Sequence, residues 1–214
     1  MEIAILVYPG FTALDAVGPY EVLCRLPGST TAFVATAPGP VTTDTGVLTL
    51  VAERGLDEMR SPDVVVVPGG PGEVAVRAGG AALDWLREVH PTTTWTASVC
   101  TGSLILGAAG LLRGRRATTH WLAVDQLRAL GAEPVDERVV VEDEHRLVTA
   151  AGVSAGIDMA LTLAARIAGD QVAQAIQLGI EYDPQPPFDS GSPHRAPADM
   201  VALLRARSRF LAEV

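Results

Sequence analysis

The sequence predicts a three-layer α/β protein with a mostly parallel central sheet. Strand-like and helix-like segments alternate along most of the 214 residues, as in sheets whose strands are joined by crossover helices. Several strand-like runs are continuously apolar, which is typical of strands covered by helices on both faces. Because no internal repeat divides the chain, we expect a single domain over residues 1–214.

The expected strands begin with the apolar run IAILVY at 3–8. This run follows the acidic Glu2 and is too short for a signal peptide, so it is interpreted as the first strand. The remaining strands are expected at 31–36, 63–68, 92–99, 138–143 and 146–151. Helical patterns predict helices at 13–26, 73–89, 101–112, 121–130, 154–168, 170–181 and 197–212.

Two hairpins interrupt this alternation. The segment 40–51 is expected to turn near Asp44 and Gly46, and the segment 138–151 is expected to turn at Asp143-Glu144. No strand pattern follows residue 151. The proline-rich segment 182–197 predicts an irregular crossing before the last helix.

Composition and charge exclude several classes of function. With 16 Lys and Arg against 25 Asp and Glu, the net charge of −9 disfavours nucleic acids and anionic membranes as partners. The short basic segment RGRR at 113–116 is interpreted as a solvated turn. No stretch approaches the roughly 18 apolar residues of a membrane-spanning helix. Two cysteines give no disulfide framework, so we expect a cytoplasmic protein with reduced thiols.

Cys100 is the candidate nucleophile. It stands where a strand feeds directly into the helical segment CTGSLILGAAG, with Ser98 and Gly102 as small neighbours that suit a sharp turn. The amino-terminal end of a helix favours negative charge, so we expect the Cys100 pKa to fall from about 8.5 into roughly the 3.5–7.5 range. Cys24 lies within the helical pattern GPYEVLCRL and is interpreted as structural.

Partners for Cys100 are expected on other loops at the same edge of the sheet, where open α/β folds bind ligands. Asp15 opens the helix after the first strand and is the best acid–base candidate. Gly69 and Gly70 follow the strand VVVV at this edge. The amides of Gly70 and Thr101 could stabilise a developing negative charge.

The segment GGPGEVA at 69–75 formally matches the dinucleotide-binding fingerprint. The match is weak because Pro71 removes one amide from the phosphate cradle. It is weakened further because the next strand ends in Val99-Cys100, where an acidic residue would be needed.

The segment GVSAG at 152–156 matches the nucleophile elbow of serine hydrolases, with Ser154 as nucleophile. That fold carries its acid and histidine on loops after later strands, and no later strand is expected here. Ser154 is therefore interpreted as the cap of the following helix. The acid and histidine candidates for this alternative are Asp183, Asp189 and His194.

The four histidines show no metal-ligand spacing, and no metal is expected. His120, in ATTHW, is interpreted as a structural residue at a helix start. The others are His90, His145 and His194.

Five segments resemble the ThiJ/PfpI superfamily, and its isocyanide hydratase branch most closely. In the redox and glyoxalase branch a glutamate stands at the place of Asp15, and in the protease-like branch a histidine stands at the place of Thr101. Both positions of this sequence fit the hydratase branch. The segments are YPGFTALDAVGPYEVL, VVVPGGPG, SVCTGSLILGAAGLLRGRRATTHW, VTAAGVSAGIDMAL and IEYDPQPPFDSGSP.

The resemblance implies a flavodoxin-like αβα sandwich with a strand-to-helix nucleophile elbow, assembled as a homodimer and needing no cofactor. It implies hydration of isocyanides, R–N≡C, to N-substituted formamides through a thioimidate on Cys100, with Asp15 and Thr101 assisting. It also places Val153, and the helix from Ser154, beside the cysteine.

The resemblance leaves the pocket and the reaction less defined. Trp121, together with Tyr182 and Phe188, is expected among the pocket walls. Ala150 and Ala151 stand where that branch tends to have extra glycine. A glyoxalase or deglycase acting through Cys100, and a redox sensor based on Cys100 oxidation, are the alternatives.

Overall fold

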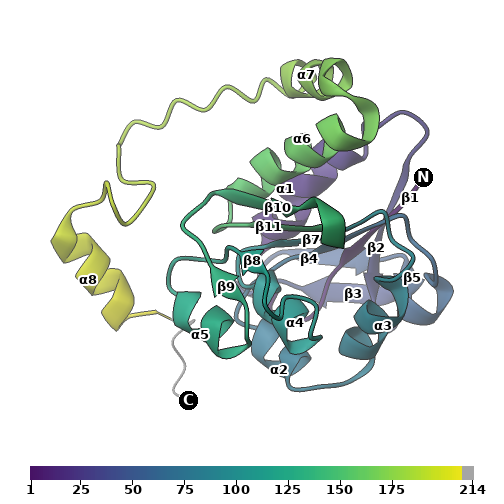
Figure 1. Cartoon of the computed structure of the whole chain (residues 1–214), viewed down its shortest axis with the longest axis horizontal. Coiled ribbons are helices and arrows are strands. Elements are labelled where there is room, and N and C mark those ends of the chain that lie inside the picture. The colour runs from purple at the N-terminus through teal and green to yellow at the C-terminus, as the bar shows by residue number, and fades with distance from the viewer. Residues whose placement is uncertain (209–214) are drawn as a thin grey trace.

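The computed structural model describes residues 1–208 and contains the mostly parallel sheet that the sequence predicts (Figure 1). Its strand order is β10-β11-β7-β6-β1-β2-β5. All neighbouring strands are parallel except β10 and β11, which form the predicted hairpin. The strands are β1 (Glu2–Leu6), β2 (Thr30–Ala35), β5 (Arg54–Gly55), β6 (Val64–Val67), β7 (Trp95–Val99), β10 (Val139–Glu142) and β11 (Leu147–Ala150).

Helices cover both faces of this sheet, which gives the predicted three layers (Figure 1). One face carries α1 (Ala13–Leu23), α6 (Ala155–Ala168) and α7 (Asp170–Gly179), and α6 packs against both of the others. The other face carries α2 (Glu73–Arg77), α3 (Ala81–Val89), α4 (Gly102–Ala108) and α5 (Val124–Ala129).

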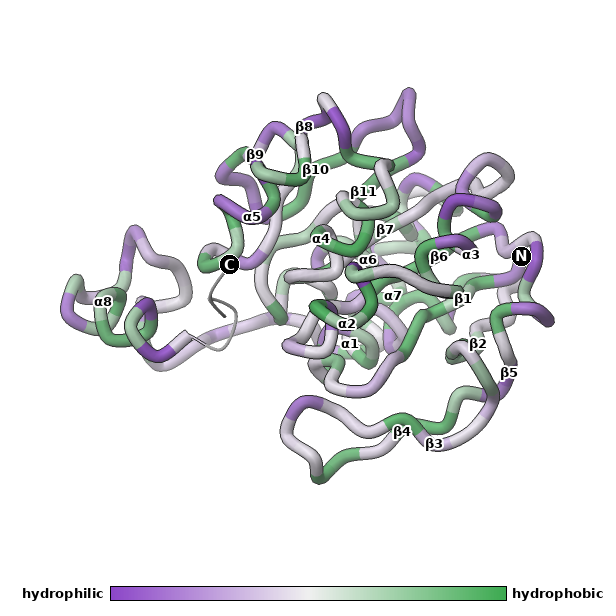
Figure 2. Tube along the Cα trace, turned by 90° about the horizontal axis from the view of Figure 1, so that it is seen from below, coloured by the Kyte–Doolittle hydropathy of each residue, from purple (hydrophilic) through white to green (hydrophobic). Residues whose placement is uncertain are grey.

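The core is centred on the middle strands of the sheet. Every residue of β6 and β7 is buried, because helices pack on both faces of these central strands. Figure 2 shows the hydrophobic segments gathered at the sheet and the hydrophilic ones in the outer loops.

The helix predicted over 73–89 is divided. The structure has α2 and α3 instead, because Gly79 and Gly80 adopt φ values of 136° and 110° that end the helical path. The predicted helix at 121–130 is shorter, and begins at Val124.

The hairpin expected over 40–51 is confirmed as β3 (Gly39–Thr42) paired with β4 (Thr49–Ala52). A further pair, β8 (Arg116–Ala117) with β9 (Glu133–Pro134), was not predicted, because two-residue strands leave no periodic pattern. Two short 3-10 helices, η1 (Leu56–Glu58) and η2 (Asp143–His145), complete the elements. The second forms the predicted turn between β10 and β11.

Residues 182–208, which we call the C-terminal arm, run away from the body and end in α8 (Ala198–Ala206) (Figure 1). As predicted, no strand follows β11 within residues 1–208. The last part of the predicted helix, residues 209–212, lies outside the described residues. No helix of the described chain is long and apolar enough to cross a bilayer.

Candidate active site

Cys100 occupies the sharp turn between β7 and α4, where its backbone φ is 57°. Its N–H donates to the carbonyl oxygens of Ala150 and Ala151, at 3.1 Å in each case. Its own carbonyl oxygen accepts hydrogen bonds from Ser103 Oγ and Thr119 Oγ1, both at 3.1 Å. A left-handed backbone conformation costs free energy for any residue other than glycine. These four hydrogen bonds hold Cys100 in that conformation.

Asp15 lies in the first turn of α1 and is fully buried. Its Oδ2 accepts a hydrogen bond from the Gly69 N–H at 2.9 Å, and its carboxyl group interacts with the thiol of Cys100. Oδ1 has no hydrogen bond of ordinary geometry among the described residues. The sequence placed Asp15 and Cys100 at one edge of the sheet, and the structure brings them into contact.

Burial raises the pKa of Asp15 from 3.8 to about 7, and the charge of Asp44 adds to this rise. The hydrogen bonds from Gly69 and Cys100 favour the carboxylate and act in the opposite direction. An acid with this pKa exchanges a proton readily at neutral pH, as general acid–base catalysis requires.

The expected low pKa of Cys100 is wrong for this structure. Burial raises the pKa of the thiol well above its ordinary value, and the negative charge of Asp15 raises it further. Hydrogen bonds from the amides of Thr101 and Val153 to the sulfur act in the other direction and are outweighed. The thiol therefore keeps its proton near neutral pH, and the carboxyl group of Asp15 is the titratable group beside it.

The role expected for the Gly70 amide is also corrected. Gly70 N–H donates to Thr101 Oγ1 at 2.9 Å, so it is already occupied. The amides that reach the sulfur are those of Thr101 and Val153. Gly69 is required for space, because a Cβ there would lie 2.5 Å from the Thr101 nitrogen.

Four polar residues at this edge were not singled out from the sequence. Ser103 and Thr119 hold the Cys100 carbonyl, and Tyr8 donates from its hydroxyl to the Pro68 carbonyl at 2.7 Å. Glu73, nearly enclosed and paired with Arg77, has its pKa raised by burial to about 7. Only Ser103 carries a local signal, because serine three residues after a turn residue commonly bonds back to it.

A cavity of about 1020 Å³ lies between the body and the C-terminal arm, and Cys100 itself, which is fully buried, is not among its wall residues. Thr119 and Val153, both hydrogen-bonded to Cys100, belong to its wall, as does Trp121. The cavity is at the upper end of the size range of small-molecule sites. The other wall residues come from segments 118–125, 134–138, 151–154 and 191–194 and from Val201 and Arg205 of α8.

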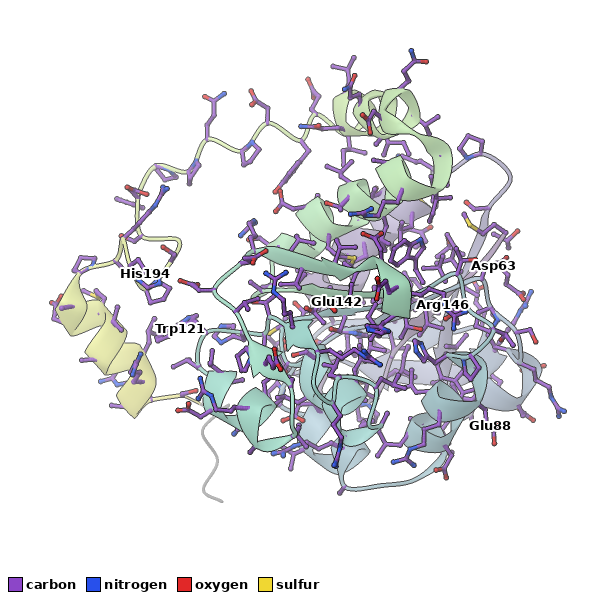
Figure 3. The ribbon with its side chains drawn as sticks, viewed as in Figure 1. Asp63, Glu88, Trp121, Glu142, Arg146 and His194 are labelled. Atoms are coloured by element: carbon purple, nitrogen blue, oxygen red, sulfur yellow. The ribbon has the colours of Figure 1, made fainter. Side chains whose placement is uncertain are left out.

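Two contacts join the arm to the body across this cavity. The guanidinium of Arg205 lies 5.7 Å from the centre of the Trp121 ring, and His194 Nε2 lies 2.6 Å from Asp136 Oδ2. Figure 3 shows Trp121 on the body side and His194 on the arm side. Both contacts are of the exposed kind that contributes about 1 kcal/mol or less.

The two other aromatic residues expected in the pocket lie elsewhere. Phe188 is 77% exposed on the arm, and the Tyr182 hydroxyl donates to the carboxylate of Asp158. Both belong to the proline-rich crossing, whose path could not be deduced from local pattern.

The structure does not bring together the residues that the serine-hydrolase alternative requires. Ser154 is exposed at the start of α6, and its Oγ accepts a hydrogen bond from Arg138 Nη2 at 3.3 Å. His194 pairs with Asp136 instead, and Asp189 pairs with Arg195. Ser154 occupies the N-cap position of α6, as predicted, but its side chain makes no capping hydrogen bond.

His120 lines the cavity, and burial lowers its pKa to about 4, so its ring is neutral near pH 7. Its Nδ1 accepts from the Leu122 N–H at 3.3 Å, which agrees with the structural role expected for it. The described residues contain no group of three His, Cys, Asp or Glu side chains arranged to hold a metal ion.

The fold and site define an α/β protein with a buried thiol–carboxyl pair at a strand-to-helix turn. The DJ-1/PfpI family model matches residues 1–166, and the chain belongs to this family. The sequence is 45% identical to an isonitrile hydratase of Pseudomonas putida over 97% of this chain and 90% of that protein. It is 29% identical to a deglycase of Thermococcus kodakarensis over 66% of this chain and 86% of that protein.

Among solved structures, a ThiJ/PfpI family protein from Pseudomonas syringae superposes with a TM-score of 0.92 at 39% identity. The match covers 96% of this chain and 85% of that one. The predicted family and sandwich fold are thereby confirmed.

Proposed function

We propose that this protein is a hydratase that converts isocyanides to N-substituted formamides, with Cys100 as nucleophile and Asp15 as proton carrier. The observation that carries this proposal is the enclosed Cys100–Asp15 pair, in a chain that is 45% identical to an isonitrile hydratase. Isonitrile and isocyanide are two names for the same group.

In the first step the sulfur bonds to the terminal carbon of R–N≡C. That carbon becomes carbanion-like and must receive a proton at the same atom. Asp15 takes the thiol proton as the sulfur attacks, and delivers it to the carbon. The product is a thioimidate, R–N=CH–S, on Cys100. A single proton shared by the pair completes this step.

In the second step water adds to the thioimidate carbon. Asp15 accepts a proton from the water and passes it to the imine nitrogen, which leaves R–NH–CH(OH)–S on Cys100 and Asp15 again as carboxylate. Collapse of this adduct breaks the carbon–sulfur bond and releases R–NH–CHO. The hydroxyl proton returns to the pair through Asp15. The net reaction is R–N≡C plus water to R–NH–CHO.

The amides of Thr101 and Val153 support both steps, because their N–H groups point at the sulfur and stabilise the negative charge that develops on it. The adjoining cavity offers room for the R group.

The test is formamide production from an aryl isocyanide, together with the intact mass of the protein during turnover. The expected results are formamide release and a mass increase equal to one isocyanide, both absent in Cys100→Ala. A folded, reduced wild-type protein that yields no formamide would refute the proposal. D-lactate formed from methylglyoxal by that protein would then support the glyoxalase or deglycase alternative.

A further inference from the structure

A second depression, of about 290 Å³, lies far from the candidate active site. Its wall includes His90, just before β7, and Arg146, just before β11, whereas Cys100 follows the other end of β7. In Figure 3 Arg146 lies over the body of the molecule, whereas Trp121 lies towards the C-terminal arm. We call this depression the basic pocket; its wall consists of His90, Gly110, Leu111, Arg115, Glu144, His145 and Arg146.

Basic side chains gather in the basic pocket, although the chain as a whole carries −9 with histidine counted as neutral. Four of its seven wall residues are Arg or His, against a single acid, Glu144. None of these four forms an ion pair with an acidic side chain in the part of the chain that the structure describes. The pKa of His90 is lowered by burial, and then by Arg146, Arg115 and His145.

The guanidinium of Arg146 is held in place. Its Nη1 donates to the carbonyl oxygens of Pro91, at 3.1 Å, and Thr93, at 3.0 Å. Its backbone is left-handed, with φ 55°. With one nitrogen used in this way, the remaining N–H groups of the fork are left for a ligand.

His90 is oriented by a chain of hydroxyl groups. Thr93 Oγ1 donates to the His90 carbonyl at 3.0 Å, so in its 2.9 Å contact with Thr96 Oγ1 it must accept. The Thr96 proton is thereby used, and the 2.9 Å contact between His90 Nδ1 and Thr96 Oγ1 requires His90 to donate. Nε2 is then the ring nitrogen left for a ligand, and it donates to an anion only when the ring takes up a second proton.

We propose that the basic pocket binds a small, doubly charged oxyanion of the phosphate type, either free phosphate or the phosphate group of a phosphomonoester. Two arginine forks donate to its several acceptor oxygens, and an imidazole nitrogen that carries a proton adds a further donor. The pocket volume suits a ligand of this size. The proposal makes Arg115 a ligand-binding residue, whereas RGRR at 113–116 is interpreted from the sequence only as a solvated turn.

The neighbouring arginines supply a matched control. Arg116 pairs with Glu137, and Arg113 lies outside the basic pocket. Arg113→Ala and Arg115→Ala remove the same charge from positions two residues apart, so long-range electrostatics affects both variants similarly. A difference in ligand binding between the two variants therefore reports a direct contact of Arg115 with the ligand.

The experiment is calorimetric titration of the full chain with inorganic phosphate and with glycerol 3-phosphate, at constant ionic strength maintained with sodium chloride. Saturable binding is expected in the wild type and in Arg113→Ala. Arg115→Ala and His145→Ala should each weaken it by about tenfold, as for the loss of one charge-assisted hydrogen bond. Tighter binding of glycerol 3-phosphate would identify a phosphomonoester as the ligand, and equal binding would identify free phosphate.

Absence of saturable binding of both probes to the wild type would overturn the proposal, as would equal weakening in Arg113→Ala and Arg115→Ala. If Arg115→Ala does not fold, the histidine ring resonances of the wild type decide. Phosphate should raise the pKa of His90, because an anion offsets its cationic neighbours, and an unchanged His90 titration would count against the pocket.

Discussion

Cys100 and Ser154 stand in two turns that look alike in sequence and follow adjacent strands. Both turns lead from a parallel strand into a helix, and both contain a non-glycine residue in the left-handed region, Cys100 with φ 57° and Val153 with φ 37°. Their surroundings differ. Cys100 is fully enclosed beside Asp15, whereas Ser154 is exposed beside Arg138.

The difference shows that the local motif determines the shape of the backbone turn, whereas the titratable group beside the turn comes from a distant segment of the chain. The Cys100 turn faces α1, which brings Asp15 from 85 positions earlier in the chain (100 minus 15). The Ser154 turn faces a surface pair of Arg138 and Asp158 at 2.6 Å. A carboxyl group without a basic partner, that of Asp15, therefore lies beside the candidate nucleophile Cys100. At Ser154 the nearby carboxylate, that of Asp158, is paired with Arg138.

The largest difference in activity is expected when each of the two candidate nucleophiles is replaced by alanine in a separate variant. Cys100→Ala should lower formamide production by about 10⁴-fold or more, as for removal of a catalytic nucleophile. Ser154→Ala should change it by less than about threefold, because the Ser154 hydroxyl contacts a surface arginine. Steady-state rates with an aryl isocyanide check both, with circular dichroism as the control for folding. The reverse order of effects would assign the chemistry to the second turn.

Asp15→Asn should come next, with a loss of about 10²–10⁴-fold, the usual contribution of a positioned acid–base group. The amide oxygen can still accept from the Gly69 N–H, so the loss reports on proton transfer rather than on the fold. The measurement is kcat for formamide release, with Asp57→Asn, at an exposed carboxylate, as the control. A variant with nearly full activity would remove Asp15 from the mechanism.

The same substitution should change the pH dependence of stability. The pKa of Asp15 is raised from 3.8 to about 7, so the native state binds this proton more tightly than the unfolded state. The stabilisation is fully present below pH 4 and is lost as the pH rises to about 7. Asp15→Asn removes this dependence, so its free energy of unfolding should exceed that of the wild type by a few kcal/mol at pH 8.

Denaturant unfolding at pH 5 and pH 8 separates the contributions. The gain of the variant over the wild type should shrink at pH 5, where most native Asp15 is protonated. A gain that does not vary with pH would show that Asp15 does not titrate in this range.

Much of the fold and the centre of the site were predictable because their signals are local. Strand-like runs identified β6 and β7, of which the β6 run is continuously apolar, and the turn residues identified both hairpins. The strand-to-helix turn at Cys100 and the place of Asp15 after the first strand followed from the rule that parallel strands end at one edge.

What could not be predicted depends on residues brought together from distant segments. The pKa of Cys100 is raised by enclosure, which the helix-terminus argument does not include. Thr119 reaches the Cys100 carbonyl from a loop after β8, a strand with no sequence pattern of its own. The homodimer implied by the family resemblance stays a prediction.

The smallest expected effect concerns the cavity that borders both turns, since Val153 and Ser154 are both in its wall. Trp121→Ala removes the aromatic surface opposite Arg205 and should raise KM for a bulky aryl isocyanide by about tenfold, the value of one stacking contact. kcat, and KM for methyl isocyanide, should change little, because the reacting pair is untouched. Phe188→Ala, which removes an exposed aromatic from the same arm, should leave every parameter unchanged. Equal effects of the two substitutions on KM would mean that the R group does not bind in this cavity, whereas a loss confined to kcat would mean that Trp121 acts on the Cys100 turn itself.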